Sequence, residues 1–172
     1  MKVSFRYRFE AAHRFLNAAA PRCQTPHGHT WRATLTWQAQ NGQLNNANML
    51  QEFQSLKSAW KTFIQEVADH SFFFNSEDPL IPHMIKEIPG FRGLPFPGDP
   101  TTEMVAILFL KKALTLAQSQ KYSGIQPYSV TVDETPVNSV EIDINCDAFV
   151  RAIEKIPTTG WWSDCEVLSR NF

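Results

Sequence analysis

Two segments near the start of the chain alternate strictly between apolar and polar residues. In residues 3–9 the apolar side chains occupy every second position, and residues 29–37 repeat the pattern. Because successive side chains of an extended strand point to opposite faces, each segment predicts a strand with one buried face. The loop between them carries Cys23 and His27. We expect the two strands to be neighbours in one sheet.

Two other segments have the three- and four-residue spacing of amphipathic helices. Between residues 49 and 67 this spacing is kept by Met49, Phe53, Leu56, Trp60, Phe63, Ile64 and Val67. A second periodic run covers residues 104–116, and the residues from Pro100 to Glu103 before it form a helix-start signal. The spacing therefore predicts two helices, each with one buried stripe.

The second half of the chain returns to alternation. Residues 128–134 and 139–145 each alternate, and the four residues between them suit a hairpin. Residues 76–100 hold six prolines and three glycines, which excludes a long regular element and leaves one short helical turn around 82–87.

The tail from Asp147 onward begins as a short helix and then becomes irregular. Trp161 and Trp162 are large apolar side chains in this irregular part, so we expect them to dock on the body of the domain.

The order of these elements indicates an α+β fold: a four-stranded antiparallel sheet covered on one face by two helices. The whole chain, residues 1–172, is expected to be a single domain. The other sheet face must also be hidden, or must line a cavity. Four strands leave open edges, which favour assembly between copies of the chain.

Composition narrows the class of protein. Hydrophobic residues make up 43% and charged residues 19%, as in ordinary globular proteins, and the net charge of -1 favours neither nucleic acid nor an anionic membrane as partner. Residues 1–10 lack the apolar core of a signal peptide, and the longest apolar run, 104–110, is too short to span a membrane. Three widely spaced cysteines argue against a disulfide framework and for a cytoplasmic setting.

The densest chemistry lies in residues 23–30, CQTPHGHT. His27 and His29 are two positions apart at the entry to a strand, so both imidazoles project to one side. His13 ends the neighbouring strand and supplies a third imidazole. Three imidazoles with one open position are typical of a catalytic zinc site, whereas Cys23 as a fourth ligand would close the site. The loop length permits either arrangement.

Asp69 and His70 follow the first predicted helix directly. An aspartate can fix the tautomer of an adjacent imidazole and raise its basicity, which suits proton transfer. A histidine that complements the helix dipole is the equal alternative. His83, in the proline-rich segment, is interpreted as a solvated loop residue.

Five short motifs in order resemble one family: FEAAHRF (9–15), CQTPHGH (23–29), ADH (68–70), PTTE (100–103) and ET (134–135). Together they are similar to the 6-pyruvoyl-tetrahydropterin synthase / 6-carboxytetrahydropterin synthase family over residues 3–145. The resemblance implies the tunnelling fold, in which sheets of three subunits join edge to edge into a barrel and two trimers stack into a hexamer. The proline-rich segment and the tail beyond residue 147 are longer than in compact members.

The resemblance also implies a role for each matching residue. Zn²⁺ would be held by His13, His27 and His29. Cys23 would be the catalytic thiol and not a metal ligand, and Asp69 with His70 would form a proton-transferring dyad. Glu134 would anchor the pterin ring, with minor contributions from Thr101, Thr102 and Glu103.

The implied substrate is 7,8-dihydroneopterin triphosphate, and two products are possible. The spacing Cys-x3-His-Gly-His is similar to the branch that forms 6-carboxytetrahydropterin with release of acetaldehyde, in queuosine synthesis. The alternatives are a 6-pyruvoyl-tetrahydropterin synthase, a folate-branch enzyme that forms 6-hydroxymethyl-dihydropterin, and a non-catalytic zinc- and pterin-binding relative.

Overall fold

The computed structural model of the chain describes residues 1–40, 43–120, 122 and 124–167. The strands are β1 (Lys2–His13), β2 (His27–Ala39), β3 (Ser71–Asn75), β4 (Gly93–Phe96), β5 (Ile125–Asp133) and β6 (Ser139–Asp143). The helices are α1 (Pro21–Gln24), α2 (Phe53–Thr62), the π-helix η1 (Phe63–Ala68), α3 (Ile81–Glu87), α4 (Thr102–Ser119) and α5 (Asp147–Lys155). All strands join one sheet, in the order β4-β3-β1-β2-β5-β6.

The four predicted strands form the centre and one edge of this sheet. β1 and β2 are antiparallel, as are β2 and β5, and β5 and β6. β1 and β2 are longer than the alternating segments that predicted them, and their register pairs His13 with His27 and Ala11 with His29. This register brings both ends of the Cys23 loop to the same end of the sheet.

The prediction of a four-stranded, wholly antiparallel sheet is wrong, because β3 and β4 add two parallel strands beyond β1. All five residues of β3 are buried, so its sequence SFFFN shows no alternation that would mark it as a strand. β4 contains Pro95 inside the proline-rich segment, and proline is tolerated there because β4 is the edge strand. The predicted turn around 82–87 is the short helix α3.

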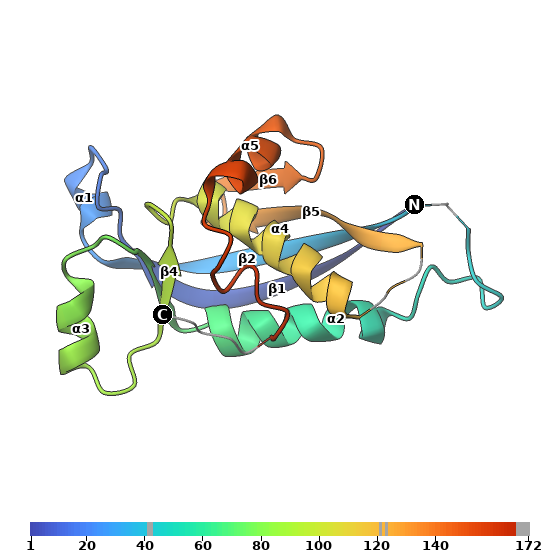
Figure 1. Cartoon of the computed structure of the whole chain (residues 1–172), viewed down its shortest axis with the longest axis horizontal. Helices are drawn as coiled ribbons and strands as arrows, with labels where there is room; N and C mark the ends of the chain where they lie inside the picture. Colours follow the sequence, from blue (N-terminus) through green and yellow to red (C-terminus); the bar gives the residue numbers. More distant parts are fainter. Residues whose placement is uncertain (41–42, 121, 123, 168–172) are drawn as a thin grey trace.

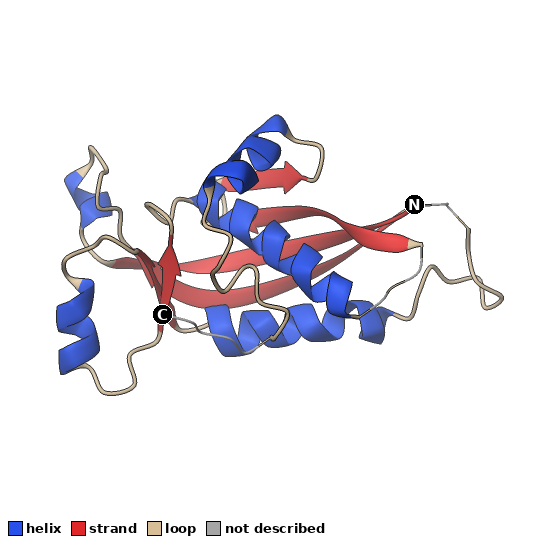
Figure 2. Ribbon diagram, viewed as in Figure 1, coloured by secondary structure: helices blue, strands red, loops and turns tan. Residues whose placement is uncertain are grey.

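Helices α2 and α4 lie along one face of the sheet (Figure 1), which confirms the predicted layering. The core between the layers includes the fully buried Trp31, Trp60 and Phe109. Figure 2 shows α1 and α3 at the end of the sheet away from the N-terminus. No helix in the described ranges is both long and apolar enough to cross a membrane.

The first predicted helix differs from residues 49–67 at both ends. Asn45 Oδ1 accepts hydrogen bonds from the backbone N–H groups of Ala47 (2.9 Å) and Met49 (3.1 Å), so a side-chain-capped turn occupies the start and α2 begins at Phe53. At the other end the helix widens into η1, where the Asp69 N–H donates to Ile64 O at 2.8 Å, five residues back. The later start and the π-helical end both come from local hydrogen bonds, which the spacing of apolar residues cannot predict.

The C-terminal tail packs on the body of the domain, as predicted for Trp161 and Trp162. Trp161 is fully buried, and its Nε1 donates to Pro95 O at 2.8 Å. The buried Lys112 Nζ donates to the carbonyl oxygens of Asp164 and Glu166, each at 2.8 Å. Burial lowers the pKa of Lys112 to about 8. The tail is thus fastened to β4 and α4 together.

Replacing Trp161 with alanine is expected to lower the free energy of unfolding by about 3–5 kcal/mol, because the change empties a fully buried site and leaves Pro95 O without its donor. Urea unfolding of both proteins measures the difference. The control is Val150→Ala on α5, where the side chain is 46% exposed, with an expected change within about 0.5 kcal/mol. A loss below about 1 kcal/mol at Trp161 would contradict this account of the tail.

Candidate active site

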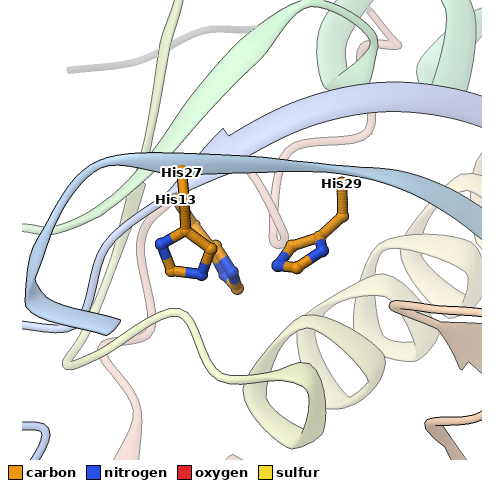
Figure 3. A group of neighbouring side chains, drawn as sticks. All are labelled: His13, His27 and His29. Carbon is orange, nitrogen blue, oxygen red and sulfur yellow. The ribbon is translucent and has the colours of Figure 1, made fainter. Parts of the chain in front are cut away.

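Three histidines gather at the end of β1 and the start of β2 (Figure 3). His13 lies opposite His27 in the ladder, and His29 is two positions further along β2, so all three imidazoles project from one sheet face. One potential ligand atom from each residue lies within 4.8 Å of the others. The ring centroid of His13 is 4.5 Å from that of His27 and 5.1 Å from that of His29. The strand pairing predicted from sequence therefore does bring these three residues together.

Backbone carbonyls orient two of the rings. His13 Nδ1 lies 3.1 Å from Pro100 O, and His27 Nδ1 lies 2.8 Å from Thr25 O. A carbonyl oxygen only accepts, so each Nδ1 carries the proton and each Nε2 keeps a free lone pair. His13 Nε2 is buried, and within the described part of the chain it has no hydrogen-bond partner. A metal ion would satisfy this nitrogen.

The electrostatics also suit a metal. Burial, together with the neighbouring His27 and His29, lowers the pKa of His13 to about 4. Burial likewise lowers the pKa of His29. Both imidazoles are therefore neutral at pH 7, which is the form that coordinates metals. Three imidazoles without a thiolate match an open zinc site.

Cys23 lies on the short helix α1 and is half-buried. Among the described residues, the group of close ligand atoms holds the three histidines and not Cys23. The Cys23 backbone is fixed by hydrogen bonds, since its N–H donates to Ala20 O at 2.9 Å and its carbonyl accepts from the Phe15 N–H at 2.8 Å. This arrangement favours a thiol separate from the metal ligands.

Glu134 stands beside the cluster. Its Oε1 accepts a hydrogen bond from Thr102 Oγ1 at 3.0 Å and lies 3.7 Å from His13 Nε2, which is proximity and not a hydrogen bond. Thr101 Oγ1 instead accepts from the Met104 N–H at 3.3 Å and caps α4. Glu103 occupies the first turn of α4, where a carboxylate complements the helix dipole. Of these predicted pterin contacts, Thr102 and Glu134 are joined, whereas Thr101 and Glu103 stabilise the helix start.

Asp69 and His70 form a hydrogen-bonded pair, with His70 Nδ1 2.9 Å from Asp69 Oδ2. Asp69 Oδ1 accepts from the Glu10 N–H at 2.8 Å. His70 has a φ of 56°, a conformation rare outside glycine and costly unless its surroundings impose it. The His70 side chain is 74% exposed, so its Nε2 is open to a ligand. Strain of this kind, directly after a π-helix, is typical of functional positions.

His70 borders a cavity of about 580 Å³ lined also by Glu10, Ala12, Thr30 and His29. Residues 10 and 12 of β1 alternate with His13, so their side chains point to the sheet face opposite the histidine cluster. A single chain thus carries the histidine cluster and the Asp69–His70 pair on different faces of the sheet.

Asp99 is a residue of this region that sequence reasoning missed. Its carboxylate accepts from the backbone N–H groups of Leu16 and Asn17, each at 2.8 Å, and from Asn75 Nδ2 at 2.9 Å. It therefore fastens the loop that leads to Cys23 onto the segment before α4. The only sequence signal is an acidic residue directly before Pro100, which by itself predicts no such contact.

A sequence model of the family described as 6-pyruvoyl tetrahydropterin synthase matches residues 2–145. The chain belongs to this family. The match ends before α5, so the docked tail lies outside it. A search of curated proteins found no match.

Several solved structures share the fold. The chain is similar to an uncharacterized protein, WS1659, from Wolinella succinogenes, with a TM-score of 0.69 and 21% identity over 84% of this chain and 98% of that one. The 6-pyruvoyl tetrahydropterin synthase of Caenorhabditis elegans gives 0.56 and 21% over 83% and 94%. That of Plasmodium falciparum gives 0.58 and 17% over 83% and 96%. At these identities the likeness concerns the fold alone.

Proposed function

We propose that this family member is a zinc-dependent 6-carboxytetrahydropterin synthase. It would convert 7,8-dihydroneopterin triphosphate and water into 6-carboxytetrahydropterin, acetaldehyde and triphosphate. The observation that carries the proposal is the cluster of His13, His27 and His29, with the Glu134 carboxylate beside it. The cluster offers one face to an ion, and Glu134 offers an acceptor for a pterin ring at the same place.

The three imidazoles would hold Zn²⁺ through nitrogen atoms that face the cluster, and the ion would supply Lewis acidity toward oxygen atoms of the substrate side chain. Glu134 can accept two parallel hydrogen bonds from a 2-amino-pyrimidinone edge. Its bond from Thr102 Oγ1 (3.0 Å) restrains the carboxylate before the ring arrives. The pair would set the orientation of the substrate.

Two groups of the chain would move protons. Cys23 Sγ, as thiolate, would take a proton from the carbon side chain of the substrate. His70 would exchange a proton through Nε2, because its Nδ1 is occupied by Asp69 Oδ2 at 2.9 Å. Since the cluster and the Asp69–His70 pair occupy opposite faces of the sheet, we propose that the pair of one copy serves the cluster of another. A hexamer built as a dimer of trimers, which the resemblance implies, would provide this meeting.

The choice of branch rests on the four-residue step from Cys23 to His27. The alternative is a 6-pyruvoyl-tetrahydropterin synthase, which eliminates triphosphate and keeps the side chain. It is favoured by the description of the matching family and by the fold shared with the synthases of C. elegans and P. falciparum.

The three cysteines bear on the cellular setting of the protein. Cys23, Cys146 and Cys165 are free thiols, which supports a reducing, cytoplasmic setting.

The test is incubation of the zinc-loaded protein with 7,8-dihydroneopterin triphosphate, followed by mass identification of the products. We expect 6-carboxytetrahydropterin together with an equal amount of acetaldehyde. Recovery of the 6-pyruvoyl product would establish the alternative branch. Bound zinc and bound pterin without turnover would identify a binding relative and refute the enzymatic proposal.

A further inference from the structure

The proline-rich segment between β3 and β4 returns to the Asp69–His70 pair. β3 and β4 are parallel, and their register aligns Phe72 with Gly93. Parallel pairing therefore sets the residue before β4 beside the residues before β3. The Phe72 N–H donates to Arg92 O at 2.7 Å, which fixes Arg92 next to the turn that carries His70.

Arg92 reaches across this turn to two backbone carbonyls. Its Nη2 donates to Glu66 O at 2.9 Å and to Asp69 O at 3.0 Å. Glu66 belongs to η1, so one nitrogen ties the end of the π-helix to the peptide group that links Asp69 to His70. A guanidinium group suits this task because it is always charged and its N–H directions are fixed.

The same peptide group is held from its other side. The N–H of His70 donates to Glu10 O on β1. The carbonyl of Asp69 is thus fixed by Arg92, and the adjoining N–H is fixed by β1. With both ends of the peptide plane held, His70 keeps its φ of 56° and its ring stays within reach of Asp69 Oδ2 at 2.9 Å.

The segment also forms a wall of the cavity that His70 borders. This cavity wall consists of Ile88, Gly90, Phe91 and Arg92. It lies across the cavity from the face of β1 and β2 that is opposite the histidine cluster. Gly93 allows this course, because a Cβ there would lie 2.7 Å from the Phe91 ring and 2.6 Å from the Phe74 ring. Any larger residue at position 93 would require the Phe91 ring, the Phe74 ring or both to shift.

We propose that Arg92 is a positioning residue for His70: it holds the Asp69–His70 peptide so that the imidazole keeps the Nδ1-protonated tautomer and presents Nε2 to the cavity. The proposal rests on the proposed function insofar as it assigns His70 to proton transfer. Arg92 acts on His70 through the Asp69 carbonyl at 3.0 Å and touches no reacting atom in this scheme.

The test compares Arg92→Met with the wild-type full-length protein. Met is apolar and has no hydrogen-bond donor, so both carbonyl contacts are lost while the side chain still fills the space of the arginine's aliphatic part. We expect kcat to fall by roughly ten- to a hundredfold with KM nearly unchanged, because the proton-transfer group is misplaced while the pterin contacts stay intact. Arg92→Lys keeps the charge and a donor, and it should recover part of the loss.

A second readout does not depend on turnover. In protein labelled with ¹⁵N-histidine, the His70 ring nitrogens should report one Nδ1-protonated tautomer in the wild type and a mixture of tautomers in Arg92→Met, with His70→Gln identifying the signals. If wild-type protein turns over no pterin, the proposed function fails, and these spectra still decide the positioning role.

Controls complete the design. Arg151→Met removes an exposed arginine on α5 whose carboxylate partner is Asp147, and it should change neither kcat nor the His70 signals. If methionine at position 92 prevents folding, Arg92→Gln provides the comparison, because its amide is too short to reach both carbonyls. A folded Met or Gln variant with wild-type His70 signals overturns the proposal, as does one that raises KM and leaves kcat unchanged.

Discussion

Replacing His29 with alanine is expected to abolish zinc binding. Wild-type protein should hold about one zinc ion per chain, whereas His29→Ala should bind zinc at least about a hundredfold more weakly, because two imidazoles remain where three were within 4.8 Å. Turnover should disappear with the metal. Metal analysis after dialysis, and competition with a chromogenic chelator, measure both quantities.

His29 is the informative ligand to change because it is half-buried, whereas His13 is fully buried and its loss would also damage packing. The matched control is His83→Ala on α3, an exposed histidine that should leave the zinc content unchanged. Wild-type zinc content in His29→Ala would show that the cluster is not the metal site.

Unlike His29→Ala, the Cys23→Ala variant should lose turnover and keep its zinc. Turnover should fall by about 10²- to 10⁴-fold, the usual contribution of a general acid or base, while zinc content stays at the wild-type level. The reason is geometric: Cys23 lies on α1 and is outside the group of close ligand atoms in the described part of the chain. Steady-state kinetics and metal analysis of the same preparation separate the two effects.

Cys165→Ala is the matched control for Cys23, because Cys165 is an exposed thiol in the tail and its loss should alter neither quantity. If Cys23→Ala loses its zinc, the thiol is a fourth ligand and the site is closed. If it keeps full turnover, some other group moves the proton. Either result would revise the role assigned to Cys23.

The histidine cluster could be predicted from the sequence because the two-residue alternation of side chains along a strand is enough to produce it. Alternation places His27 and His29 on one face, and antiparallel pairing of the alternating segments 3–9 and 29–37 brings His13 beside them. Phe9 and Trp31 are buried on the same face and fix the register, because shifting one strand by one residue would turn its own buried side chains to the opposite face.

The rest of the site depends on contacts that no repeating pattern of apolar and polar residues predicts. β3 is buried on both faces, so its residues do not alternate, and without β3 nothing in the sequence places Asp69 and His70 relative to the sheet. The roles of Asp99 and Arg92 come from single side chains that reach backbone groups 83 and 23 residues away along the chain. Such pairings arise from the parallel strands, which composition and local spacing leave undetermined.

The π-helix η1 has a consequence for the direction in which the chain leaves it. An α-helix turns by about 100° for each residue, and the bond from Asp69 N–H to Ile64 O spans one residue more than an α-helical bond. If this turn had α-helical bonds, Asp69 would be rotated by about a quarter-turn around the helix axis. Its carboxylate would then point away from the Glu10 N–H that it now accepts from. The extra residue in η1 therefore sets the direction in which the Asp69–His70 pair points relative to β1. Deleting one residue from 63–68 would keep a helix there but would turn the pair away from Glu10.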